Sequence, residues 1–215
     1  MRGSQFTGKL RGLGVAAALL GTTACGEVSR TGRSPAFVII ERLEGASGAD
    51  PDSFSTVVHS DVLTLVKKTI DGTEARIPTI FSDPGRATFR VALKNPGTVA
   101  APTAPTSLNQ VTLTRYRVVY KRSDGRNTQG VDVPYAFDGG MTVTIPADSN
   151  VTGFFELVRI MAKDEAPLTR LVNNGGVEFF STIADVTFYG TDQAGNEVTV
   201  TGSITVSFAD YGDPD

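Results

Sequence analysis

The chain has 215 residues, a formal net charge of −3 and 40% apolar residues, a composition typical of a folded globular protein rather than a disordered one. A nucleic-acid-binding protein would carry a clear excess of basic residues, so this mildly acidic balance argues against nucleic acid as a partner. One cysteine allows no intramolecular disulfide, and one cysteine with one histidine leaves little material for a zinc site.

Residues 1–24 differ from the rest of the chain and predict an export signal. Arg2, Lys9 and Arg11 make a basic start, and residues 13–20 (LGVAAALL) form a short apolar run that small residues follow. This order of basic, apolar and small segments is that of a secretory signal peptide. The apolar run is too short for a membrane-spanning helix, which needs about 20 apolar residues.

Residues 22–25 (TTAC) end this segment and resemble the lipobox of bacterial lipoproteins, in which two small residues precede the cysteine that receives the lipid. Ala24 and Cys25 match that pattern, whereas Thr22 stands where leucine is usual. The resemblance implies that the signal is cut after Ala24 and that Cys25 carries acyl chains such as palmitate, which would anchor the protein to a membrane of the bacterial cell envelope. The alternative is an ordinary signal peptide, which would release a soluble secreted or periplasmic protein.

Removal of the signal changes the charge of the mature chain. It takes away three of the 20 basic residues and none of the 23 acidic residues, so the net charge falls from −3 to −6. Such a chain is not attracted to an anionic lipid surface, so membrane attachment would depend on the lipid at Cys25. Residues 25–35 are polar, contain Gly and Pro, and are expected to form a short tether.

Residues 36–210 are expected to form one β-sandwich domain, followed by a flexible tail at 211–215. Segments rich in β-branched and aromatic residues alternate with turn formers, which predicts roughly eight to ten strands and an all-β, antiparallel sandwich. The expected strands are 36–43, 56–66, 77–81, 87–94, 111–121, 131–137, 141–145, 152–161 and 177–183, with loops at 45–53 and 95–109. One short helix is expected near residues 165–173, where an acidic start and Pro167 fit a helix N-terminus.

Residues 183–208 show the clearest strand pattern. Apolar residues occupy even positions from Val186 to Phe208, and polar residues occupy most odd positions. A period of two indicates one buried and one solvated face, and residues 192–196 (DQAGN) have the composition of a turn, so this stretch predicts a β-hairpin. Gly202 lies on the apolar face, where glycine often marks a bend, and a kink is expected there. Residues 138–140 (DGG) predict a second hairpin turn.

Two short segments resemble known β-domains. Residues 191–196 (TDQAGN) are similar to a turn common in bacterial immunoglobulin-like domains, and residues 89–97 (FRVALKNPG) resemble a strand and turn of immunoglobulin-like envelope modules. These resemblances imply an immunoglobulin-like sandwich. They imply no catalytic residues, because neither family has a shared catalytic site.

Two local clusters of chemically active side chains have simple structural explanations. His59, Ser60 and Asp61 are the residue types of a catalytic triad, but neighbours in a strand point to opposite faces. His59 and Asp61 are expected to share one face and Ser60 to point away, so the three do not converge. Arg115 and Arg117 share one strand face with Lys121, which predicts a solvated face or, alternatively, a contact for an anion or an acidic glycan.

Calcium is the one cofactor that the sequence suggests. Calcium takes six to eight oxygen ligands, and loop carboxylates of exported β-domains can supply them. Asp192 and Asn196, in the turn of the 183–208 hairpin, are the residues expected to take part. Asx residues are also ordinary turn formers, and the D-x-[DN]-x-[DN]-G pattern does not occur.

The functional hypothesis is an envelope-anchored, non-enzymatic β-sandwich lipoprotein that mediates binding or structural assembly with a protein or glycan partner. Two alternatives stay open. One is an exported hydrolase or carbohydrate-active protein, whose pair of carboxylates would be defined by distance in the fold rather than by sequence. The other is a small subunit of an envelope complex, joined to its partners through an exposed sheet edge.

Overall fold

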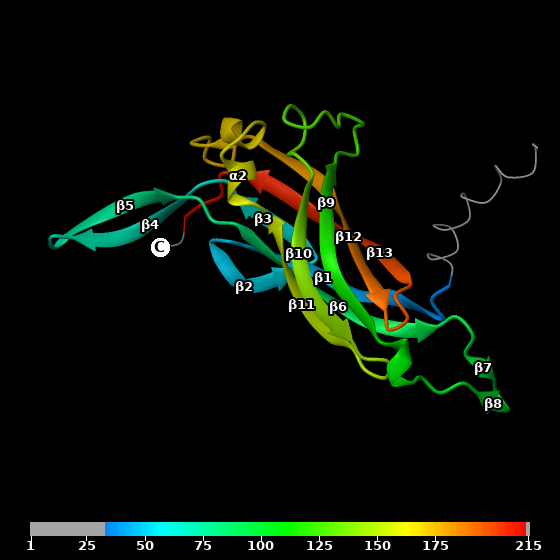
Figure 1. The fold of residues 1–215 in the computed structure, drawn as a ribbon. Helices are drawn as coiled ribbons and strands as arrows, with labels where there is room; N and C mark the ends of the chain where they lie inside the picture. Colours follow the sequence, from blue (N-terminus) through cyan, green and yellow to red (C-terminus); the bar gives the residue numbers. More distant parts are fainter. Residues whose placement is uncertain (1–32, 214–215) are drawn as a thin grey trace, which may run out of the picture.

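The computed structural model describes residues 33–213, which form two β-sheets packed face to face (Figure 1). The strand orders are β11-β6-β1-β2 in the four-stranded sheet and β10-β9-β12-β13-β3 in the five-stranded sheet. The four-stranded sheet consists of β1 (Ala36–Ser47), β2 (Asp50–Ser55), β6 (Asp83–Leu93) and β11 (Val151–Val158). The five-stranded sheet consists of β3 (Val57–Asp61), β9 (Val111–Lys121), β10 (Phe137–Ile145), β12 (Phe179–Asp192) and β13 (Glu197–Ala209).

Neighbouring strands in both sheets are antiparallel, except that β3 runs parallel to β13 at one edge. The predicted all-β, antiparallel sandwich is therefore confirmed, with one parallel pair that the sequence did not indicate. The immunoglobulin-like character stays a prediction.

The core lies between the two sheets and follows the two-residue period of the strands. In β9, Tyr116, Val118 and Tyr120 are buried, whereas Arg115 and Lys121 are exposed. Phe89 of β6 and Phe188 of β12 meet edge to face, with ring centroids 4.8 Å apart. Burial of a phenylalanine side chain contributes about 1.5–3 kcal/mol relative to exposure, so such cross-sheet contacts hold the two layers together.

The hairpin predicted for residues 183–208 is confirmed as β12 and β13, which pair without interruption from Phe179↔Ala209 to Thr191↔Glu197. The kink expected near Gly202 is wrong, because Gly202 pairs regularly with Val186. A Cβ atom on Gly202 would lie only 2.9 Å from Ile40 Cδ1 and 3.1 Å from Leu43 Cδ2, both in β1. Glycine occupies this position because the opposite sheet leaves no room for a side chain.

The second hairpin, predicted around residues 138–140, is also wrong. The strand β10 runs through these residues and pairs with β9 on one side. A Cβ atom on Gly139 would lie 2.2 Å from Tyr116 Cζ. Gly139 therefore makes room for a core tyrosine instead of turning the chain.

Several elements differ from the sequence predictions. The strand expected at 131–137 is wrong, because β10 begins only at Phe137 and includes the segment 141–145 that was expected as a separate strand. The strand β2 occupies residues expected to lie in the loop 45–53, and the strand expected at 56–66 is divided into β3 and β4 (Thr64–Ile70). The strand expected to reach residue 161 ends at Val158, and α2 (Ile160–Lys163) follows it. The short helix expected near 165–173 is the 3-10 helix η2 (Leu168–Leu171), whose two leucines are buried.

Two parts of the chain lie outside the main sheets. Strands β4 and β5 (Thr73–Thr79) form a separate two-stranded sheet, here called the hairpin arm (residues 64–79), which extends away from the sandwich (Figure 1). Its turn, Asp71-Gly72, has positive φ at both residues (50° and 78°), as tight hairpin turns require. The predicted loop 95–109 contains β7 (Gly97–Thr98), β8 (Ala101–Pro102) and η1 (Ser107–Asn109).

Candidate functional site

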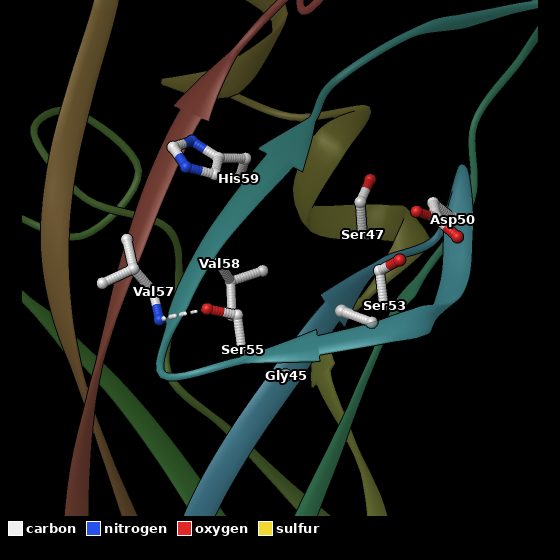
Figure 2. A pocket seen from close by; sticks show the side chains of 9 residues that line it. Gly45, Ser47, Asp50, Ser53, Ser55, Val57, Val58 and His59 are labelled. Atoms are coloured by element: carbon white, nitrogen blue, oxygen red, sulfur yellow. Dashed lines mark hydrogen bonds between the residues drawn. The ribbon is translucent and has the colours of Figure 1, made fainter. Parts of the chain in front are cut away.

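A surface hollow of about 340 Å³ lies where the chain crosses from the edge of one sheet to the edge of the other. The chain leaves β2 at Ser55 and enters β3 at Val57, so the two edge strands diverge around the crossing. Figure 2 shows this edge hollow, with the backbone N–H of Val57 donating to Ser55 Oγ at 3.3 Å. The lining residues are Gly45, Ala46, Ser47, Asp50, Ser53, Ser55, Val57, Val58 and His59.

The edge hollow is lined by three serines together with small and apolar residues, Asp50 and His59, and it does not assemble a catalytic triad. His59 and Asp50 lie on opposite sides of it in Figure 2. The imidazole instead contacts Tyr211, whose hydroxyl lies 3.2 Å from Nδ1. Ser60 points into the protein, fully buried. This agrees with the prediction that His59 and Ser60 do not converge.

Asp61 is placed differently from the sequence prediction, which put it on the same face as His59. The Asp61 side chain is buried, whereas His59 is exposed. The carboxylate of Asp61 accepts hydrogen bonds from the backbone N–H of Tyr211 and from the hydroxyl of Thr64. These bonds fix the chain where it leaves the sandwich for the hairpin arm, which is a structural role.

Behind the edge hollow lies a buried polar cluster of Ser60, Asp83 and Lys163. Lys163 Nζ donates to Asp83 Oδ1 at 2.7 Å, and the two side chains are only 1% and 0% exposed. Asp83 Oδ2 and Ser60 Oγ are both buried and make no hydrogen bond of normal geometry. The cluster therefore combines an enclosed amine, a carboxylate with one unpaired oxygen and a free hydroxyl.

Three separate parts of the chain build this cluster. Asp83 begins β6 and pairs with Val158 at the end of β11, and the single turn of α2 then returns Lys163 to Asp83. Gly48 donates its backbone N–H to Asp83 Oδ1 at 2.7 Å. A Cβ atom on Gly48 would lie 2.3 Å from the carbonyl oxygen of Ser82, so only glycine permits this approach.

Burial dominates the electrostatics of the cluster. Burial raises the pKa of Asp83 above its ordinary value, and the charge of Lys163 offsets only part of that effect. The Ser60 hydroxyl also lies close enough to lower the pKa of Asp83 slightly, despite its poor hydrogen-bond geometry. Burial, followed by the charge of Asp83, raises the pKa of Tyr120 well above its ordinary value. Tyr120 accordingly stays a neutral donor, with its hydroxyl 2.6 Å from the carbonyl oxygen of Leu157.

The basic strand face predicted on β9 is present, and acidic residues of the same chain offset most of its charge. Arg115 and Arg117 both donate to Asp138, at 2.7 and 2.6 Å. Lys121 Nζ lies 2.7 Å from Asp185 Oδ2. These ion pairs favour the solvated-face interpretation over a contact for an anion or an acidic glycan.

Asp192 and Asn196, the predicted calcium ligands, face each other within the β12–β13 turn. Asp192 Oδ1 accepts the backbone N–H groups of Ala194 and Asn196, both at 2.9 Å, and Oδ2 accepts Asn196 Nδ2 at 2.9 Å. Burial alone would raise the pKa of Asp192, but these hydrogen bonds bring it below its ordinary value. Within residues 33–213, no group of three or more His, Cys, Asp or Glu residues is placed to hold a metal ion. The calcium site stays a prediction.

The predicted lipidation site, Cys25, and the signal peptide lie outside the described residues 33–213. Over that described range, no helix has the length and apolar character needed to cross a bilayer.

The sequence interpretation missed the buried pair itself. Asp83 lies in a segment (SDPG) with the composition of an exposed turn, and Lys163 lies in a polar run (KDE). Neither segment carries a local signal of burial, because the pair forms between residues 80 positions apart.

Comparisons with protein-family models, curated proteins and solved structures gave no match for this chain.

Proposed function

We propose that this chain is an envelope-anchored, non-enzymatic β-sandwich lipoprotein that mediates binding or structural assembly, and that the hairpin arm is its contact with a protein partner. The observation that carries the proposal is the arm itself. Its two strands pair with no strand of either main sheet, and it extends away from them (Figure 1). At its base, the Thr64 hydroxyl donates to Asp61 of β3. A lone two-stranded hairpin is at best marginally stable in water, so contact with a second molecule would stabilise it.

The arm has one comparatively apolar face. Cross-strand partners share a face, and the pairs Val66↔Ile77 and Ile70↔Thr73 lie on the same side. Ile70, next to the turn, is 47% exposed. This face supplies apolar surface that a protein partner would bury.

The composition of the arm favours a protein over a glycan. Residues 64–79 (TLVKKTIDGTEARIPT) contain no aromatic side chain, so the arm lacks the flat rings on which sugars commonly stack. Its three basic residues outnumber its two acidic ones. In a chain of negative net charge, this local excess is suited to an acidic protein surface.

Site-specific photocrosslinking tests the proposal in the cells that make the protein. A photoreactive residue at Thr73, which is exposed and pairs with Ile70 on the apolar face of the arm, is expected to give a discrete protein adduct. The same residue at Thr142, exposed on β10, serves as the matched control and is expected to give none. Ile70→Asp should abolish the Thr73 adduct while the purified protein keeps its β-type circular dichroism. Equal labelling at both positions, or an adduct that Ile70→Asp leaves unchanged, would contradict the proposal.

The hydrolase alternative has one specific observation in its favour. Glu41 and Asp148 line the same shallow hollow at the other end of β1. Glu41 Oε1 lies 2.9 Å from Arg90 Nε, however, and Oε2 accepts Asn150 Nδ2 at 3.2 Å. A carboxylate held in this way fits a structural ion pair. Turnover of a glycoside substrate that Glu41→Gln abolishes would establish the alternative.

A further inference from the structure

We propose that Lys163 and Asp83 become joined by an intramolecular isopeptide bond, in which Lys163 Nζ is covalently bonded to Asp83 Cγ. The proposal is independent of the hairpin arm and its partner. It rests on the geometry of the buried cluster and on the unpaired groups within it.

The reacting atoms are already close together. Lys163 Nζ lies 2.7 Å from Asp83 Oδ1, so the carboxyl carbon is no farther than about 4 Å away, because the carbon–oxygen bond adds about 1.23 Å. Productive near-attack contacts are about 3–3.5 Å. A small shift of the long Lys163 side chain would therefore bring Nζ within reach of Cγ.

The surroundings penalise the charged pair relative to a neutral pair. The two side chains are almost completely removed from solvent, and an ion pair pays a large desolvation penalty there. Transfer of one proton along the hydrogen bond converts the ammonium and carboxylate into an amine and a carboxylic acid, without changing the total charge. The raised pKa of Asp83, caused mainly by burial, supports this transfer. A neutral amine is the nucleophilic form of lysine.

The bond-forming step is balanced without an oxidant or a cofactor. The lone pair of Nζ forms the new bond to Cγ, and one carbon–oxygen bond of Asp83 breaks. The departing oxygen leaves as water with the carboxyl hydrogen and one hydrogen from Nζ. We assign the transfer of that proton to Ser60 Oγ, which is buried beside Asp83 without a regular hydrogen bond. Exclusion of bulk water then protects the amide from hydrolysis.

The same chain contains a matched pair that should not react. Lys121 Nζ also lies 2.7 Å from Asp185 Oδ2, but its side chain is 57% exposed and that of Asp185 is 23% exposed. Water stabilises both charges there, so this ion pair lacks the desolvation penalty that favours proton transfer in a buried pair. Distance being equal, burial distinguishes the two pairs.

Peptide mapping of the full-length protein, purified in its folded form, tests the proposal. In an unlinked chain trypsin releases residues 77–86 (IPTIFSDPGR) and cuts after Lys163. The cross-link is expected to block that cut and to join 77–86 to 160–170 (IMAKDEAPLTR), in a product lighter by one water molecule than the two peptides together. Lys163→Arg keeps the positive charge but cannot form this amide, so it should release 77–86 alone.

Two further samples make the result decisive. Lys121 and Asp185 should remain unlinked in the same digest. Protein kept in denaturant from the time of synthesis should contain no 83–163 link, because the folded site brings the groups together. The proposal is overturned if folded wild-type protein, incubated for several days, still yields 77–86 as a separate peptide, or if the Lys121–Asp185 pair is linked to the same extent.

Discussion

At the scale of single residues, the Lys163–Asp83 pair places two ionisable side chains where water cannot reach them, which carries a large desolvation cost. Lysine is almost never fully buried unless it is paired, and Lys163 is 1% exposed. Gly48 supplies a further hydrogen bond to Asp83 Oδ1, while Asp83 Oδ2 has none. A buried ion pair of this kind adds little stability over an apolar pair, but loss of one partner leaves an isolated buried charge.

Lys163→Met should therefore destabilise the protein strongly. Removal of one partner from a buried pair costs about 3–5 kcal/mol, and loss of the proposed cross-link would add to this. The double variant Asp83→Leu/Lys163→Met removes both charges. It should recover much of the unfolding free energy that the single variant loses by leaving Asp83 unpaired. Urea unfolding followed by circular dichroism measures the difference. Lys121→Met, in the exposed pair, is the control and should cost about 1 kcal/mol or less; equal losses in the two single variants would contradict the argument.

Protonation of the Asp192 carboxylate is expected to account for part of the stability that the protein loses in acid. Its folded-state pKa is lowered below the ordinary value of 3.8, so its contribution to stability is present above that value. The contribution is lost as the pH falls through the lowered folded pKa. Asp192→Asn should reduce the loss of unfolding free energy between about pH 5 and pH 2. Parallel pH profiles for the variant and the wild type would show that the turn does not depend on the charge.

At the scale of elements, the strands are positioned by contacts across the sandwich as much as by their own pattern. Gly202 and Gly139 both lie in regular strands, opposite side chains that need the space. The hydrophobic period determines which face of a strand is buried. It does not show how closely the opposing layer approaches, and that distance decides whether a glycine bends the strand or only makes room.

Gly202→Val should destabilise the sandwich by overpacking. A Cβ atom there already meets Ile40 Cδ1 at 2.9 Å, and added methyl groups in a packed core typically cost about 1–3 kcal/mol. Gly140→Val is the control, because a Cβ atom on Gly140 has no heavy atom within 4 Å. Thermal unfolding of both variants tests the difference. Combining Gly202→Val with Leu43→Ala should recover part of the loss, and an unchanged melting temperature for Gly202→Val would refute the close-contact explanation.

At the scale of the whole molecule, the described residues form a sandwich with one projecting arm. Tyr211 and Asp213, beyond the last strand, hydrogen-bond to Asp61 and to the backbone of Leu65, so the end of the described chain lies against the base of the arm. The proposed lipid at Cys25 would hold this body near a membrane through the predicted tether 25–35. Anchor and arm together would allow a partner in the envelope to be bound within reach of the tether.

Cys25→Ala should release the protein from the membrane. Wild-type cells given a fatty-acid analogue should label the protein and retain it in the membrane fraction, whereas the variant should be unlabelled and soluble. The physical reason is that several acyl chains give stable anchoring, at about 0.8 kcal/mol per buried CH₂, and the acidic mature chain has no electrostatic substitute. A wild-type protein that takes up no label and fractionates as soluble would contradict the lipoprotein hypothesis.

The sequence by itself determined the elements whose signal is local. The alternation in residues 183–208, the turn at Asp192–Asn196 and the buried face of β9 could all be predicted, because a strand with one buried face repeats every two residues. The antiparallel sandwich followed from the number and spacing of such segments.

The tertiary structure alone decided the candidate site. Asp83 and Lys163 lie 80 residues apart, and they meet only because β11 is the neighbour of β6 in the sheet order. Strand order depends on how whole sheets bury their apolar faces, and no short segment records it. The roles of Gly139 and Gly202 likewise depend on the distance to side chains from other strands. Contacts between residues far apart in the sequence are therefore known only from the tertiary structure, whereas the two-residue period of each strand can be recognised in the sequence itself.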